Sequence, residues 1–170
     1  MKFRRRDPVR DPALFNGPAR ITDRCSEERA RAFDFLIGDW SGELTGGDSA
    51  RIRSHTLRAW PILGGCAIME FIQPGEGDAA EARFRIRSFV PGEDRWVQYT
   101  VRKRSPVLVR WEGSPTDDRS LARVTRVPGE PAIRAVYSDI ASDAFVREVQ
   151  ARDGEGGAWR TVSRTRYRRR

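Results

Sequence analysis

The chain has 170 residues, a hydrophobic content of 38% and a formal net charge of +8, which suits one soluble domain with a buried core. Its mean hydropathy is -0.64, and no apolar run approaches the roughly 18 residues that a transmembrane helix needs. The basic start, residues 1–6, is not followed by an apolar stretch, which argues against a secretory signal. We therefore expect a cytoplasmic protein with no membrane partner.

Arginine supplies almost all of the positive charge. Only two of the 32 basic residues are lysines, Lys2 and Lys103, a ratio typical of a GC-rich genome and so a weak sign of function. The arginines are spread along the chain, whereas a nucleic-acid site usually forms one basic stripe interleaved with aromatic residues. We expect a solvated, basic outer face and no nucleic-acid partner.

Two cysteines, Cys25 and Cys66, are too few for a disulfide framework. Cys66 stands in an apolar run, so we expect a buried thiol there. A bridge to Cys25 is the alternative.

The first part of the chain divides into an arm and a short helix. Residues 1–24 are rich in Arg, Asp and Pro and predict a basic N-terminal arm, a candidate lid for a cavity. Residues 25–170 predict one barrel domain. At its start, residues 26–33 are typical of a short helix, with Ser26 or Asp23 as the N-cap and two early glutamates that suit the helix dipole.

The rest of the chain alternates with a period of two, which indicates β-strands. Short segments are separated by Gly, Pro and Asp: 51–60, 66–73, 82–88, 95–104, 107–112, 121–127, 133–138, 144–152 and 158–168. Because no long crossover separates them, they predict an all-β fold. We expect a single up-and-down antiparallel barrel of about eight to ten strands with a short N-terminal helix.

The clearest alternation lies in the segment 82–88. Phe84 and Ile86 alternate there with Arg83, Arg85 and Arg87. An antiparallel strand with one buried face and one solvated face explains this pattern. We expect the arginines to face solvent and Phe84 to face the interior.

Four motifs resemble a bacterial lipocalin-like (calycin) β-barrel family, mostly described as of unknown function. They are FDFLIGDW at 33–40, ILGGCAIME at 62–70, FVPGEDRWVQ at 89–98 and the closing strand WRTVSRTRYR at 159–168. The resemblance covers residues 33–168 and leaves the arm outside. It implies a barrel around a cavity, with Gly38 and Trp40 plugging one end, and it carries no agreed activity.

His55 is the only histidine and is expected on the same strand face as Arg51 and Arg53. It is either an outward or rim residue or a catalytic base. A zinc site needs three or four ligands, and no such cluster is visible, so we expect no metal. A haem-binding relative of the fold ligates iron through a histidine near its C-terminal strands. None stands there in this chain, and we expect no cofactor.

Glu70 lies between apolar neighbours, Met69 and Phe71. A buried carboxylate must be paired or take up a proton. One interpretation is a salt bridge to an inward arginine such as Arg147. The other is a cavity acid with a raised pKa that acts as proton donor, base or ligand anchor.

Other polar and aromatic residues on the strands are candidates to orient a ligand. Tyr137 is the third catalytic candidate, after Glu70 and His55. The ligand-binding candidates are Trp60, Phe84, Gln98, Trp111 and Arg147. Trp40, Trp96 and Trp159 are interpreted as barrel plugs and packing residues.

Two function classes follow from this pattern. The first is a barrel that takes a small, largely apolar organic molecule into its lumen. It acts as a plain binder or as a cofactor-independent cyclase or isomerase of natural-product metabolism. The alternative is a non-catalytic interaction module whose arginine-rich outer face binds an acidic partner or RNA. A homodimer is left open. The volume of the lumen discriminates between the two classes.

Overall fold

The computed structural model describes residues 28–46, 52–75, 82–103, 105–114, 119–123, 130–154 and 156–170. The predicted arm at 1–24, with its role as a lid, lies outside these residues. None of the described helices has the length and apolar character to cross a membrane.

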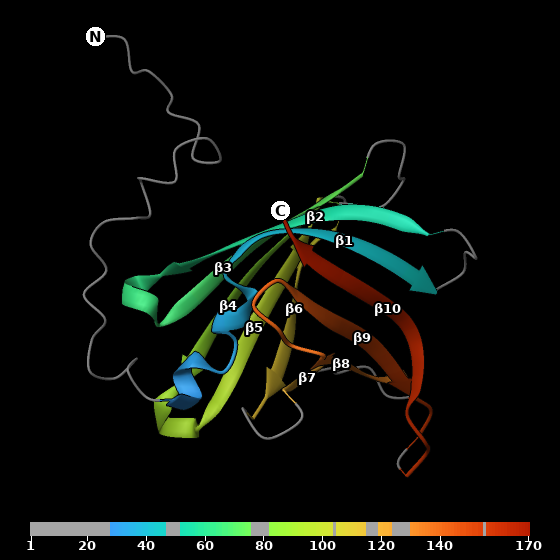
Figure 1. Cartoon of the computed structure of the whole chain (residues 1–170). Helices are drawn as coiled ribbons and strands as arrows, with labels where there is room; N and C mark the ends of the chain where they lie inside the picture. The colour runs from blue at the N-terminus through green and yellow to red at the C-terminus, as the bar shows by residue number, and fades with distance from the viewer. Residues whose placement is uncertain are drawn as a thin grey trace, which may run out of the picture.

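The described part forms the predicted barrel. Its strands are β1 (Gly38–Gly46), β2 (Arg53–Ile62), β3 (Ala67–Pro74), β4 (Arg83–Val90), β5 (Arg95–Arg102), β6 (Ser105–Gly113), β7 (Ser120–Arg123), β8 (Ala132–Ser138), β9 (Ala144–Arg152) and β10 (Arg160–Arg169). Each pairs with its neighbour in sequence, and β1 closes the barrel against β10 (Figure 1). All pairings are antiparallel, which confirms the single up-and-down barrel.

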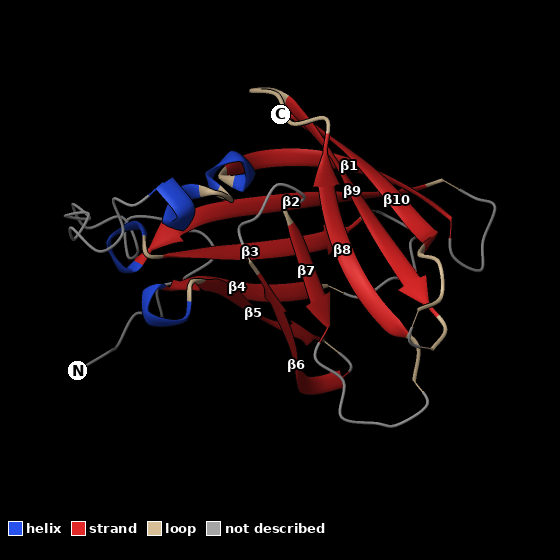
Figure 2. Ribbon diagram, turned by 90° about the horizontal axis from the view of Figure 1, so that it is seen from below, coloured by secondary structure: helices blue, strands red, loops and turns tan. Residues whose placement is uncertain are grey.

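Short 3₁₀ helices gather at one end of the barrel (Figure 2). They are η3 (Glu28–Arg31), η4 (Asp34–Leu36), η5 (Leu63–Gly65) and η6 (Pro91–Glu93). The predicted N-terminal helix is thus present as the two short turns η3 and η4, which precede β1.

An aromatic plug fills this end. Phe33 and Trp40 are fully buried, as is Trp96 of β5. Trp96 Nε1 donates to the carbonyl of Arg29 at 3.0 Å, and Trp40 Nε1 donates to the carbonyl of Leu36 at 2.7 Å. These two bonds fasten η3 and η4 to the barrel wall, so the expected plug role of Trp40 and Trp96 agrees with the structure.

Trp159 takes a different position from the expected plug. The guanidinium carbons of Arg134 and Arg152 lie 4.4 Å and 4.8 Å from its ring centroid. Both arginines are on the outer face, because their neighbours Ile133 and Ala151 face inward as a cross-strand pair. Cation–π contact with these arginines therefore holds Trp159 against the outside of the barrel.

The orientation of β4 is opposite to the expected one. Arg85 and Arg87 are only 4% and 0% exposed, while Phe84 pairs with Phe71 on the outer face, where it is half-buried. The expectation that these arginines face solvent is wrong. The physical reason is Glu70, which is paired with Arg85 across β3 and β4 and provides a buried negative charge.

Cys66 also differs from the expected free thiol. It is disulfide-bonded, and the other cysteine of the chain, Cys25, lies outside the described residues. Disulfides are rare in cytosolic proteins, so this bond weighs against the expected cytoplasmic location.

Candidate ligand-binding site

The barrel encloses a cavity of about 430 Å³ between the aromatic plug and the opposite end. This volume lies within the range of about 300–1,000 Å³ that is usual for small-molecule sites. The cavity is lined by Leu44, Arg53, His55, Ile72, Pro74, Arg83, Arg85, Gln98, Thr100, Arg102, Val107, Val109, Trp111, Ile133, Arg147, Val149, Val162, Ser163, Thr165 and Tyr167.

The polar lining of this cavity is strongly cationic. Five of the lining residues are arginines: Arg53 from β2, Arg83 and Arg85 from β4, Arg102 from β5 and Arg147 from β9. Among the described residues, no aspartate or glutamate lines the cavity. The lumen is therefore a positively charged compartment.

The greater part of the apolar lining comes from β6 to β10. Its members are Val107, Val109, Trp111, Ile133, Val149 and Val162. The arginines come mostly from β2 to β5, with Arg147 as the exception. Most of the arginines and most of the apolar residues of the lining thus come from different groups of strands.

Glu70 of β3 lies on the side of the cavity nearer the aromatic plug and is completely buried. Arg85 Nη1 donates to its Oε2 at 3.1 Å, and Arg87 Nη2 forms an ion pair with its Oε1 at 2.9 Å. Arg87 Nη2 also donates to Gln98 Oε1 at 2.7 Å and to the hydroxyl of Tyr137 at 2.8 Å. One carboxylate therefore holds two arginines in a buried polar network.

This network keeps Glu70 ionised. Burial by itself would raise the pKa of Glu70, but Arg87 and Arg85 outweigh burial and lower it below its usual value. The salt-bridge interpretation is thus favoured, with Arg85 and Arg87 as the direct partners instead of Arg147. The expected raised pKa of a cavity acid is wrong.

Arg83 and Arg147 are not held by a salt bridge of this kind. Among the described residues, neither forms an ion pair with a carboxylate, and the Nε of each is buried without a hydrogen-bond partner. Burial lowers the pKa of Arg83 to about 10, helped by the positive charges of Arg85, Arg102 and Arg147. Buried, unmatched donors of this kind are rare in folded proteins and favour an acceptor from outside the chain.

His55 and Tyr167 form a second polar contact at the cavity wall. His55 Nε2 and the Tyr167 hydroxyl are 2.8 Å apart, and the rings meet edge to face. Burial raises the pKa of Tyr167, although Arg147 and Arg85 oppose the shift. His55 therefore lines the lumen, so of the expected outward or rim position the outward one is wrong.

Tyr137 lies behind the cavity wall, toward the plug. Burial would raise its pKa, but Arg87 and Arg147 outweigh burial and lower it. Its ring packs edge to face against Phe33 and Phe35, and it is not one of the residues that line the cavity.

The structure brings most of the candidate residues together. Gln98, Trp111, Arg147 and His55 line the cavity, with Glu70 and Tyr137 just behind them. Trp60 and Phe84 lie on the outer face, one residue away from inward neighbours such as Ala59 and Arg85. We therefore leave these two out of the proposed site.

Four lining arginines were not among the candidates: Arg53, Arg83, Arg85 and Arg102. The sequence signal that finds two of them is the acid in the preceding strand. If Glu70 faces inward, Arg85, which pairs directly with it on β4, must face inward too. Arg83 then also faces inward, because it is two residues from Arg85 on the same strand.

Comparison with known proteins supports the fold. No family model matches the chain, and no curated protein matches it. The S-type phycobiliprotein lyase CPES from Guillardia theta has a similar structure, with a TM-score of 0.53, 12% sequence identity, and coverage of 86% of this chain and 95% of that one. This likeness shows the fold alone and is consistent with a barrel of the lipocalin type, and the motif resemblance stays a prediction.

A second solved structure gives a weaker likeness. It is a protein of unknown function from the DUF3598 family of Nostoc punctiforme, with a TM-score of 0.42 and 16% identity. The match covers 81% of this chain and about half, 48%, of that protein.

Proposed function

We propose that the protein binds a small organic anion with an apolar body in the barrel lumen. The observation that carries this proposal is a cavity of about 430 Å³ lined by five arginines and, among the described residues, by no carboxylate. The ligand has an apolar body, as the sequence predicts. It also carries a negatively charged group, which the arginines of the cavity favour.

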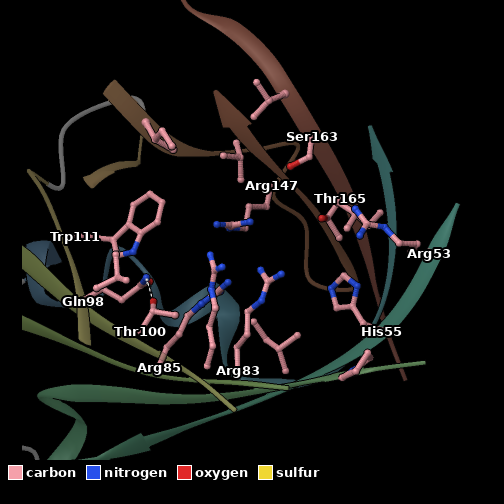
Figure 3. Close-up of a pocket in the computed structure, with 18 of the residues that line it drawn as sticks. Arg53, His55, Arg83, Arg85, Gln98, Thr100, Trp111, Arg147, Ser163 and Thr165 are labelled. Carbon is pink, nitrogen blue, oxygen red and sulfur yellow. Dashed lines mark hydrogen bonds between the residues drawn. The ribbon is translucent and has the colours of Figure 1, made fainter. Parts of the chain in front are cut away.

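The charged group of the ligand binds between three arginines of the lumen. Arg83 and Arg85 of β4 and Arg147 of β9 point toward one another across the cavity (Figure 3). Hydrogen bonds between charged groups contribute about 1.5–3 kcal/mol each. Burial, and after it the positive charges of Arg85, Arg102 and Arg147, lower the pKa of Arg83. An anion placed between the guanidiniums offsets both effects.

The apolar body of the ligand lies against the side formed by β6 to β10. Trp111 projects into the lumen there (Figure 3), and Val109, Ile133 and Val149 line the same side. Apolar surface removed from water contributes about 25 cal/mol per Å². The Trp111 Nε1 donor is buried without a hydrogen-bond partner, which adds one site for a ligand oxygen.

Binding is better supported than catalysis. A cyclase or isomerase with Glu70 as its acid would need a protonated carboxyl that reaches the substrate. Glu70 is held ionised by two arginines and does not line the cavity. The alternative of a basic outer face also has less support, because the arginines of β4 face inward and outer Arg58 and Arg95 are paired with carboxylates.

A matched pair of fluorescent probes tests the proposal. 8-Anilinonaphthalene-1-sulfonate (ANS) is an anion, and N-phenyl-1-naphthylamine has nearly the same apolar body without the sulfonate. We expect the wild-type protein to bind ANS at least about tenfold more tightly, a difference of about 1.4 kcal/mol. Fluorescence titration measures both constants, and equal affinity for the two probes would contradict the proposal.

Two variants locate the bound anion. Arg147→Met should weaken ANS binding by about tenfold or more and change the binding of the neutral probe by less than about threefold. Arg58→Met is the control, because Arg58 lies on the outer face and pairs with Asp39. If Arg58→Met weakened ANS binding as much as Arg147→Met, the lumen would not be the site.

A further inference from the structure

The charges around Arg83, Arg85 and Arg147 do not balance. Arg83, Arg85 and Arg147 line the cavity, and Arg87 lies one step deeper, hydrogen-bonded to the lining residue Gln98. Glu70 is the one described carboxylate that pairs with any of them. Four guanidiniums therefore face one carboxylate, which leaves an excess of three positive charges.

A ligand with a single negative charge leaves most of this excess in place. Charges held away from water are costly unless they are paired and hydrogen-bonded. A head group with two negative charges and several oxygens compensates more of the guanidiniums and accepts from more of the buried donors, which include Nε of Arg83, Arg85 and Arg147.

From this excess, and resting on the proposed function above, we infer that the natural ligand is an organic phosphate monoester. A phosphate monoester carries about −1.5 to −2 charges at pH 7 and three strong acceptor oxygens. Arginine pairs with such oxygens through two parallel hydrogen bonds. The phosphate lies between β4 and Arg147, and the organic part lies against Trp111.

Other groups near the phosphate also titrate or carry charge, so a pH test needs an internal control. On the strands around this part of the lumen they are Arg53, His55, Glu70, Arg83, Arg85, Arg87, Arg102, Tyr137, Arg147 and Tyr167. Of these, His55 is of the residue type whose free side chain titrates in the same pH range as the second phosphate ionisation. A ligand whose charge stays constant separates the two effects.

The test compares 1-naphthyl phosphate with 1-naphthyl sulfate, measured by calorimetric titration of the full chain. The two esters have the same shape and the same three terminal oxygens, but the sulfate keeps one negative charge. At about pH 7.5 we expect the phosphate to bind at least about tenfold more tightly. At about pH 5 the phosphate is mostly a monoanion, and the preference should fall to within about twofold.

The outcomes separate this inference from the proposed function. If both esters bind with equal affinity at about pH 7.5, the site takes organic anions but the phosphate assignment is wrong. If neither ester binds, and ANS does not bind either, the proposed function itself fails.

A variant adds a second readout. Arg83→Met removes one of the excess charges and leaves both arginines that pair with Glu70. The preference for phosphate over sulfate should fall by at least about threefold, with the sulfate affinity less affected. An unchanged preference in a folded variant would overturn the proposed role of Arg83 in recognising the second charge.

Discussion

Glu70 illustrates how a single buried side chain determines the polarity of a barrel interior. Its carboxylate is fully buried and contacts two guanidiniums. Arg85 gains from the same contact, since the pKa of its guanidinium is raised although burial lowers it. The pair orients β4 so that every second residue of that strand, including Arg83, faces the lumen.

Removing the Glu70 charge should destabilise the protein strongly. Glu70→Gln leaves Arg85 and Arg87 buried with no carboxylate, and breaking a buried pair in this way costs about 3–5 kcal/mol. Denaturant unfolding at neutral pH measures the loss. The control is Glu43→Gln on the exposed face of β1, which should change the free energy of unfolding by less than about 0.5 kcal/mol.

The same pair of proteins gives a pH test. The pKa of Glu70 is lowered in the folded protein, so its stabilising contribution is present above the unfolded value of 4.5 and is lost as the pH falls through the folded value. The stability difference between wild type and Glu70→Gln should therefore shrink below pH 4.5. A difference that stayed constant under acid would show that Glu70 is not ionised in the folded state.

At the scale of the elements, the closure of the barrel depends on a close approach at Gly42. This residue of β1 pairs with His55 of β2 and with Tyr167 of β10. A Cβ atom at Gly42 would stand 2.6 Å from His55 Nε2 and 2.9 Å from Tyr167 Cε1. Glycine leaves the space in which these two side chains meet.

Gly42→Ala should push His55 and Tyr167 apart and cost about 1–3 kcal/mol, as overpacking does in other cores. Thermal unfolding measures the effect. Gly92→Ala in η6 is the matched control, because a Cβ there meets nothing within 4 Å. Equal melting temperatures for Gly42→Ala and wild type would contradict the close packing at this seam.

The strands and turns were predictable from the sequence, but the faces of several strands were not. Alternation in 82–88 fixes which residues share a face, and it does not say which face is inside. The usual rule of apolar inside and polar outside fails at β4, because Glu70 on β3 makes an inward arginine favourable. Trp60 shows the same limit, since its neighbour Ala59 takes the inward position.

The site was predictable in part for the same reason. Gln98, Trp111, Arg147 and His55 were found as strand residues with polar or aromatic groups, and they line the cavity. The cationic character of the lumen depends on which residues pair between strands, and the composition of the chain does not reveal that pairing. The high arginine content of the chain therefore did not indicate that several arginines face the lumen.

At the scale of the whole molecule, burying positive charge in the lumen costs stability. The lowered pKa of Arg83 means that its charged form is less favourable in the folded than in the unfolded chain at any pH below about 10. That cost is present at neutral pH. It is the kind of destabilisation that functional sites often carry.

Arg83→Met should consequently stabilise the ligand-free protein while it weakens anion binding. We expect a gain of about 1 kcal/mol in the free energy of unfolding, measured by denaturant unfolding at low ionic strength. Arg58→Met, which breaks an exposed ion pair with Asp39, should give no gain. A loss of stability in Arg83→Met would show that its guanidinium is well compensated in the folded chain.

A crystal structure of the protein with ANS would show whether an organic anion occupies the lumen. The sulfonate should lie between Arg83, Arg85 and Arg147, and the aromatic body should contact Trp111. ANS bound on the outer face with an empty lumen, or bound in the lumen with its sulfonate directed away from these arginines, would contradict it.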